Sequence, residues 1–258
     1  MAKFVTYKVL LQRKIMRPLF IATCFGLVAS PALAVEKINT PPVVKDRMQL
    51  EYLLTGSLDG EDPAQDNSQR HRVQIGTGVT DDLDIAISYS ANHQFNDTES
   101  FGPGIRARYE LTEQKDYWFA SGVQARYTHR TDDGADDLHV RGLVQRRQGD
   151  WMLGGNLGLR REFGAQRRES VEMRMAMNAL YQLDPRFNPG IEYFTVPGQL
   201  NDLASFSDQP HEVGPVFYGA WPISEVGSIA YSAGYYQGLT DAAPDHSTKI
   251  IVQYLQQF

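Results

Sequence analysis

Apolar and polar residues alternate with a period of two along most of the chain after residue 47. Such alternation predicts β-strands with one apolar and one polar face. Helical periodicity is nearly absent, and even the Met-rich segment VEMRMAMNALY alternates strictly. Twelve strands are predicted, bounded by Gly, Pro, Asp and Asn, at Met48–Thr55, Arg72–Thr80, Leu83–Asn92, Gly104–Leu111, Tyr117–Thr128, Leu138–Gln145, Trp151–Arg160, Val171–Tyr181, Gly190–Val196, Glu212–Trp221, Gly227–Tyr236 and Thr248–Phe258.

The connections between these segments alternate in length. The short ones are TDDLD, TEQKD, RQGD, LDPRF and PISE, and longer ones such as SLDGEDPAQDNSQR, HQFNDTESF and GQLNDLASFSDQPH lie between them. If the chain starts on the periplasmic side, every short connection is periplasmic and every long one extracellular. This is the arrangement of an even-stranded membrane barrel. The predicted fold is therefore all-β, a transmembrane antiparallel up-and-down β-barrel of about 12 strands.

The two predicted faces differ in chemistry. One carries aliphatic and aromatic residues such as Ile75, Ile87, Val123, Leu157 and Met175, which we expect to contact lipid. The opposite face is polar and charged. A soluble β-sandwich would alternate in the same way, with its polar face in water.

Two features favour the membrane barrel over the sandwich. Aromatic residues gather beside the short connections, as an interfacial belt requires: Tyr117, Trp118, Trp151, Tyr181, Phe187, Trp221 and Phe258. Glycines occur on the polar face, where we expect them to make room for bulky Arg neighbours: Gly76, Gly78, Gly122, Gly154, Gly158 and Gly234. Since unpaired backbone groups are costly in lipid, a membrane-bound all-β chain should be a closed barrel.

The N-terminal 34 residues have the layout of a secretory signal peptide. A basic stretch precedes an apolar run from Leu19 to Val28, and Ala32 and Ala34 form an A-x-A cleavage site. We therefore expect cleavage before Val35, a barrel over residues 35–258, and export to the bacterial outer membrane. Met1 and Met16 are both possible starts. The apolar run is shorter than the roughly 20 residues that a membrane-spanning helix needs.

Removing this leader changes the composition of the chain. It contains five of the 25 basic residues and none of the 31 acidic ones, which leaves a net charge of −11. It also contains the only cysteine, so the mature chain has no disulfide or thiolate chemistry. An acidic chain is a poor candidate for nucleic-acid binding.

The C-terminal segment TKIIVQYLQQF alternates up to the last residue, with Tyr254 and Phe258 on one parity. It resembles the closing strand of bacterial outer-membrane β-barrels, which typically ends in Phe and carries the assembly signal. This resemblance implies that Tyr254 and Phe258 are read by the barrel-assembly machinery. Gln256 departs from the pattern, which usually has a large apolar residue there. The alternative is an ordinary buried terminal strand.

The C-terminal third contains HEVGPVFYGAW and YSAGYYQGLTDAAPD. Over about 50 residues it resembles proteobacterial outer-membrane proteins of the meta-pathway phenol-degradation type, which are transporters of small organic compounds. The shared motifs are those of turns and loops, so the resemblance implies the fold more than a substrate.

The residues expected to line the lumen are rich in arginine. They are Arg72, Arg106, Arg108, Glu110, Arg126, His139, Arg141, Arg160, Glu172, Arg174, Glu192 and Lys249. If most of the arginines pair with the acids, they form a structural network that can close the lumen. If several are unpaired along one wall, they form a basic track for anionic solutes.

Enzymatic chemistry has little support in the sequence. The six histidines form no metal-binding spacing, and all but His139 are expected in or beside long connections as exposed residues. A G-x-S-x-G elbow is absent. The acidic pieces DGEDPAQD and DDGADD lack the EF-hand order, so solvated loops are favoured over a cation site. No catalytic residue, metal or cofactor is therefore assigned, and an outer-membrane hydrolase ranks third among the functions considered.

Two functions remain. The first is a narrow outer-membrane channel or facilitator for small solutes, anionic or aromatic. The second is a non-transporting structural or surface-interaction barrel that acts through acidic extracellular loops. The partners expected for either are outer-membrane lipid and lipopolysaccharide, with small solutes for the channel.

Overall fold

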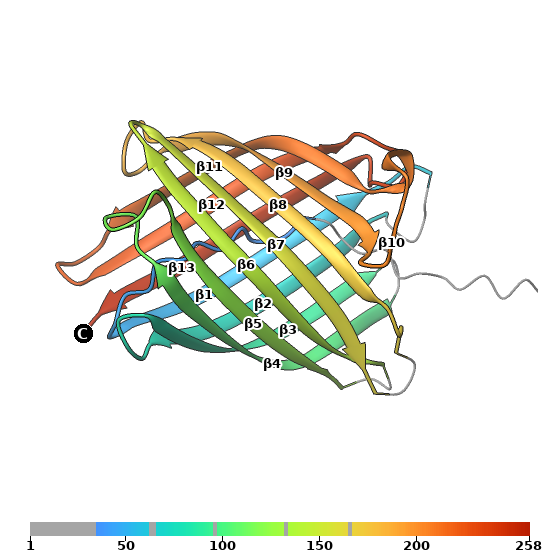
Figure 1. Cartoon of the computed structure of the whole chain (residues 1–258), viewed down its shortest axis with the longest axis horizontal. Coiled ribbons are helices and arrows are strands. Elements are labelled where there is room, and N and C mark those ends of the chain that lie inside the picture. Colours follow the sequence, from blue (N-terminus) through green and yellow to red (C-terminus); the bar gives the residue numbers. More distant parts are fainter. Residues whose placement is uncertain (1–34, 62–65, 95–96, 132–133, 165–166) are drawn as a thin grey trace, which may run out of the picture. The chain divides into compact units, whose positions relative to one another are not determined.

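Twelve antiparallel strands form a closed β-barrel (Figure 1). The computed structural model describes residues 35–61, 66–94, 97–131, 134–164 and 167–258. The barrel strands are β1 (Arg47–Leu58), β2 (Ser68–Gly78), β3 (Leu83–Gln94), β4 (Asp97–Thr112), β5 (Ala120–Arg130), β6 (Asp136–Gln148), β7 (Trp151–Phe163), β8 (Val171–Tyr181), β9 (Asn188–Gln199), β11 (His211–Pro222), β12 (Gly227–Gly238) and β13 (His246–Gln257). All of the predicted strands form, in the predicted order, which confirms the fold class.

Each strand pairs with its neighbours in the chain, and β1 closes the barrel against β13. Leu53, for example, lies opposite Ile251 on β13 and opposite Arg72 on β2. Because both edges of every barrel strand are paired, the wall leaves no strand edge open to lipid. No helix in the described part of the chain is long and apolar enough to cross a membrane.

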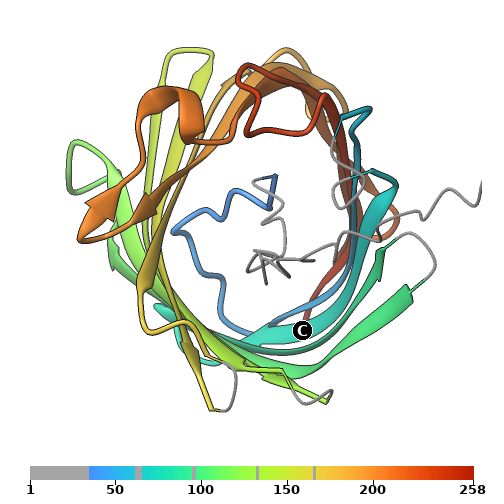
Figure 2. The same cartoon turned by 90° about the vertical axis from the view of Figure 1, so that its right-hand side faces the viewer.

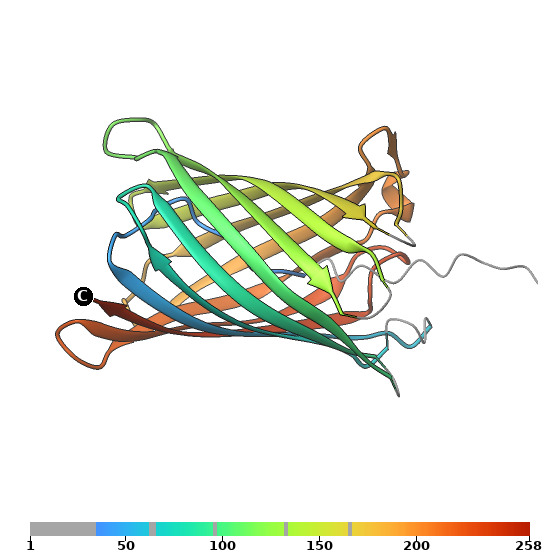
Figure 3. The same ribbon diagram turned by 90° about the horizontal axis from the view of Figure 1, so that it is seen from below.

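The connections sort to the two ends of the barrel. Residues 79–82, 113–119, 149–150, 182–187 and 223–226 connect strands at one end, here called the short-turn end, which also holds the C-terminus (Figure 3). The opposite, long-loop end carries the other connections, including β10 (Asp202–Leu203) and the short 3-10 helix η1 (Phe206–Asp208), neither of which was predicted. The predicted loop HQFNDTESF is wrong, because β3 extends to Gln94 and β4 begins at Asp97.

The apolar face of the strands points outward. Ile75, Ile87, Val123 and Leu157 are between 37% and 62% exposed, whereas the alternating positions Gln74, Gln124 and Asn156 are buried inside. This polarity is the reverse of a soluble protein's, and it suits a wall with hydrocarbon outside and a polar interior.

Aromatic side chains surround the short-turn end. Trp151 lies against Tyr181 with ring centroids 5.3 Å apart, Trp221 stacks on Tyr231 at 4.7 Å, and Arg146 lies 4.0 Å over the Trp118 ring. Amphipathic rings at this level match the aromatic girdle of membrane barrels.

Candidate functional site

Residues 35–46, here called the lumen segment, run inside the barrel before the chain enters β1 (Figure 2). The segment forms no strand. Pro41 and Pro42 supply no backbone N–H, so this stretch cannot add a full ladder to the wall. Asp46, with φ of 58°, turns the chain into β1 at the short-turn end. No element inside the barrel was predicted from the sequence, and the lumen segment occupies the space in which a solute would travel.

Hydrogen bonds from the wall hold the middle of the lumen segment and the part nearer the short-turn end. The Asn39 N–H donates to Asn156 Oδ1 at 2.7 Å, and Asn156 Nδ2 donates to the Asn39 carbonyl at 2.8 Å. Closer to the short-turn end, the Val43 N–H donates to Glu110 Oε2 at 2.9 Å. Arg108 Nη1 donates to the Thr40 carbonyl at 2.8 Å. The wall side chains therefore replace the backbone partners that the segment lacks.

Charged residues hold the part of the lumen segment that lies farthest from the short-turn end, here called its upper end. Lys37 pairs with Glu51 on β1, and Glu36 pairs with Arg141 on β6. Lys249 Nζ on β13 also lies 3.3 Å from the Glu36 carbonyl oxygen. The segment is thus tied to strands on several sides of the lumen.

Two inward-facing glycines leave space for groups inside the lumen. A Cβ on Gly78 would lie 2.1 Å from the Val44 carbonyl oxygen of the lumen segment, and one on Gly158 would lie 2.3 Å from His139 Nε2. The predicted reason for such glycines, room for arginine neighbours, is therefore wrong at these positions. They make room for the lumen segment and for a histidine.

Most of the predicted lumen arginines, and Lys249, form salt bridges with acids of the wall or of the lumen segment. Asp84 receives hydrogen bonds from Arg106, at 2.6 Å, and from Arg108. Other partners complete the set: Arg72 with Glu51 at 3.3 Å, Arg174 with Glu172 at 2.6 Å, Arg160 with Asp137 at 3.7 Å, Arg141 with Glu36, and Lys249 with Glu192. Glu192 also accepts hydrogen bonds from Tyr218 and Tyr236. The interior is therefore largely a salt-bridged network.

Two arginines lie outside that network. Arg126 donates to Gln74 Oε1 at 2.8 Å and to Ser88 Oγ at 3.4 Å. Arg70, which was not predicted, donates from Nε to Asn92 Oδ1 at 3.1 Å. Within the described residues neither forms a salt bridge with a carboxylate. Each thus carries a charge without a carboxylate partner, on the long-loop half of the lumen.

Both arginines line a cavity of about 100 Å³ that has the lumen segment on one side. Seven Lys and Arg side chains line it, against the acids Glu36 and Asp137. The seven cations still outnumber the acids when Glu51, Glu162 and Glu172, which pair with some of these cations, are added to the two acids of the lining. The lining is Val35, Glu36, Lys37, Leu53, Thr55, Arg70, Arg72, Ser90, Arg126, Thr128, Asp137, His139, Arg141, Arg160 and Arg174. A small anion would find several guanidinium donors here.

His139 lies among these arginines as a hydrogen-bond acceptor. Arg141 Nη2 lies 2.9 Å from His139 Nδ1. Because arginine has only donors, this imidazole nitrogen must accept, and the ring adds no charge to the cavity.

The other histidines lie toward the long-loop end, as predicted, but His211 is not exposed. It is 3% exposed, stacks on Phe206 at 4.1 Å, and lies 2.6 Å from Tyr193 Oη. The expectation of an exposed loop histidine is wrong here, because the unpredicted η1 packs over the ring. Among the described residues, no cluster of three or more His, Cys, Asp and Glu could hold a metal ion. The acidic pieces DGEDPAQD and DDGADD fall partly outside the described residues.

The C-terminal residues lie at the short-turn end. The Phe258 N–H donates to the Asp46 carbonyl at 3.1 Å, and its ring is 74% exposed beside an outer groove lined by Met48, Ile75 and Ile87. Tyr254 Oη donates to Gln256 Oε1 at 2.7 Å. Phe258 is therefore on the apolar outer surface, and it fills no soluble core.

Comparison with known proteins identifies the fold but no family. No protein-family model and no curated protein matches the chain. Among solved structures, an outer membrane channel from Pseudomonas putida F1 aligns with 87% of this chain and 100% of its own, at 14% identity and a TM-score of 0.58. The NanC porin aligns with 81% of this chain and 100% of its own, at 8% identity and a TM-score of 0.52. The chain thus shares the fold of outer-membrane barrels.

Proposed function

We propose that this protein is an outer-membrane channel for small anionic solutes, and that the lumen segment constricts it. The observation that carries the proposal is the cation-rich cavity beside the lumen segment, in which Arg70 and Arg126 have no carboxylate partner in the part of the chain that the structure describes. An apolar outer wall, a polar interior and an aromatic girdle support a position in the outer membrane.

The cavity favours carboxylates over other small solutes. Guanidinium groups bind carboxylates bidentately, and desolvation inside the barrel strengthens each contact. Because the neighbouring arginines are already neutralised by wall acids, binding is expected to be weak enough for release, as conduction requires. Because the resemblance to meta-pathway phenol-degradation proteins lies mainly in turns and loops, the choice of small or aromatic organic acids as solutes rests on the guanidinium groups of the cavity.

The two ends of the chain concern its export and its insertion into the membrane. We propose export by the N-terminal leader and insertion by the barrel-assembly machinery, which would read Phe258 and Tyr254 at the short-turn end. Lipid and lipopolysaccharide would then contact the outer wall. The absence of enzymatic activity stays a prediction.

The reversal potential across a planar bilayer in a salt gradient tests the solute charge. The variant Arg70→Ser with Arg126→Ser removes both unpartnered charges from the cavity. Arg161→Ser with Arg146→Ser removes the same charge from side chains outside the cavity lining. The proposal expects anion selectivity in the wild type, a loss of selectivity in the first variant, and wild-type behaviour in the second. Cation selectivity in the wild type would contradict it.

The non-transporting barrel is the second candidate. The observation that favours it is the occupied lumen, since the lumen segment bonds to Asn156, Glu110, Arg108, Glu51 and Arg141. Such a barrel would conduct no ions even after these contacts were removed, whereas a constricted channel would gain conductance.

A further inference from the structure

Glu212, near the long-loop end of β11, differs from the other lumen carboxylates that the structure describes. Its side chain is 0% exposed, and among the described residues its carboxylate oxygens have neither a hydrogen-bond partner of good geometry nor a salt bridge. By contrast, Glu51, Asp84 and Glu192 each pair with at least one Lys or Arg. The backbone nitrogen of Val35 and the Ser247 hydroxyl face the Glu212 carboxylate, and the Tyr236 hydroxyl lies near it.

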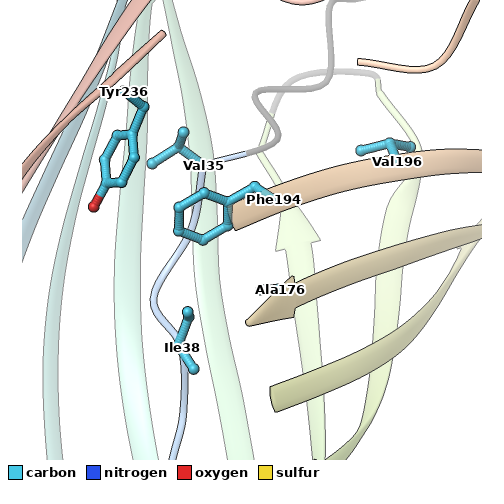
Figure 4. Close-up of a cluster of buried hydrophobic side chains, with 6 residues drawn as sticks. All are labelled: Val35, Ile38, Ala176, Phe194, Val196 and Tyr236. Atoms are coloured by element: carbon cyan, nitrogen blue, oxygen red, sulfur yellow. The ribbon is translucent and has the colours of Figure 1, made fainter. Parts of the chain in front are cut away.

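Val35 is held firmly at this place. It is 1% exposed and belongs to an apolar cluster with Ile38, Ala176, Phe194, Val196 and Tyr236. Figure 4 shows its side chain between the rings of Tyr236 and Phe194, which themselves meet edge to face at 5.2 Å. The cluster holds Val35 against β8, β9 and β12, and β12 pairs with β11 on one side and β13 on the other.

Val35 is also the residue that follows the A-x-A site of the predicted leader. In the precursor its nitrogen is an uncharged amide. During cleavage, water adds across the Ala34–Val35 peptide bond: the hydroxyl stays on the Ala34 carboxyl carbon, and the Val35 nitrogen leaves as an amine. That amine takes up a proton at neutral pH and becomes an ammonium group.

We propose that the α-ammonium of Val35, created by leader removal, is the counter-ion of Glu212, and that this ion pair holds the upper end of the lumen segment in place. A buried carboxylate without a cation is strongly unfavourable, so the precursor lacks a partner that the mature chain supplies. The neighbouring cation, Lys249, is already paired with Glu192. The lumen segment would therefore dock fully only after maturation. This inference rests on cleavage before Val35 and does not depend on which solute passes.

The test is the chemical reactivity of the α-amine in the exported, detergent-purified barrel. Intact-mass analysis first identifies the N-terminal residue. The rate of α-amine acetylation by an N-hydroxysuccinimide ester at pH 7 is then followed on the N-terminal peptide. We expect Val35 as the first residue, and an acetylation rate in Glu212→Gln at least about tenfold above the wild type, since one pKa unit of lost stabilisation is a factor of ten. Glu225→Gln, in an exposed turn, should react like the wild type.

A second variant keeps the test valid if Glu212→Gln does not fold, which a gel shift between unboiled and boiled samples would reveal. Inserting Gly–Ser before Val35 moves the ammonium by roughly 7 Å of extended chain. This variant should react about as fast as Glu212→Gln, and combining the two changes should add nothing further. Equal rates in the wild type, Glu212→Gln and the insertion variant would overturn the ion pair, as would a mature chain that begins at another residue.

Discussion

Replacing Asn156 with Ala tests whether the lumen segment constricts the barrel. Asn156 makes two buried hydrogen bonds to the backbone of Asn39, at 2.7 and 2.8 Å. Each such bond contributes a net 0.5–1.5 kcal/mol, so their loss weakens docking of the segment by about 2 kcal/mol. Since about 1.4 kcal/mol is a factor of ten in an equilibrium constant, the ratio of open to closed channels should rise about 30-fold.

Single-channel recording measures this ratio directly from open and closed dwell times. The change should come mainly from shorter closed dwell times, because the lost contacts belong to the docked state. Ser232→Ala is the matched control: the Ser232 hydroxyl is buried in the lumen and has no hydrogen-bond partner among the described residues, so the dwell times should change less than about twofold. Unchanged gating in Asn156→Ala, or equal changes in both variants, would show that these two hydrogen bonds do not hold the lumen segment in the closed channel.

Three further predictions concern the wall and its assembly. Ile87→Arg should destabilise the barrel by about 2–4 kcal/mol because Ile87 faces lipid, whereas Gln124→Arg on the inner face should cost less; denaturant titration of the refolded protein in lipid vesicles compares them. Deleting Phe258 should lower the amount of heat-modifiable protein in the outer membrane without reducing leader cleavage, as measured by gel shift and intact mass. Gly78→Val should displace the lumen segment and raise conductance, since even a Cβ at this position clashes with its backbone, whereas Gly142→Val, with open space around it, should not.

The wall of the barrel was predictable from sequence because its signal is local. Each strand must present alternating residues to lipid and to the interior, and a shift of one residue exchanges the two faces. The alternation therefore identified β8 (Val171–Tyr181) at its true bounds and placed Ile75 and Gln74 on the correct sides. Strand ends were less predictable, since β3 and β4 continue past the apolar band through residues that read as a polar loop.

The contents of the lumen were not predictable in the same way. The lumen segment has no periodicity, and its position depends on contacts with residues far away in the chain, such as Asn39 with Asn156. Its Pro41–Pro42 pair and mixed charge read as an ordinary linker. The pairing of the arginines could not be predicted either. Arg106 and Arg108 share Asp84, whereas Arg126 donates hydrogen bonds to Gln74 and Ser88. These partners depend on the closure and stagger of the whole barrel.

The polar face nevertheless carried useful information. Its richness in arginine was visible in the sequence, and it led to both alternatives, a paired network and a basic track. The structure has a paired network over most of the lumen and, among the described residues, two arginines without carboxylate partners at one cavity. The sequence therefore showed that the lumen would be rich in arginine. Which arginines pair with acids became clear only from the closed barrel.

Deleting residues 36–44 tests whether the lumen segment constricts the channel, because the deletion removes most of that segment and leaves all barrel strands intact. Conductance and reversal potential would be recorded for the wild type and the deletion in the same salt gradient. We expect a several-fold larger conductance in the deletion variant, with anion selectivity retained because Arg70 and Arg126 remain on the wall. No conductance in a correctly folded deletion variant, or a cation-selective current, would contradict it.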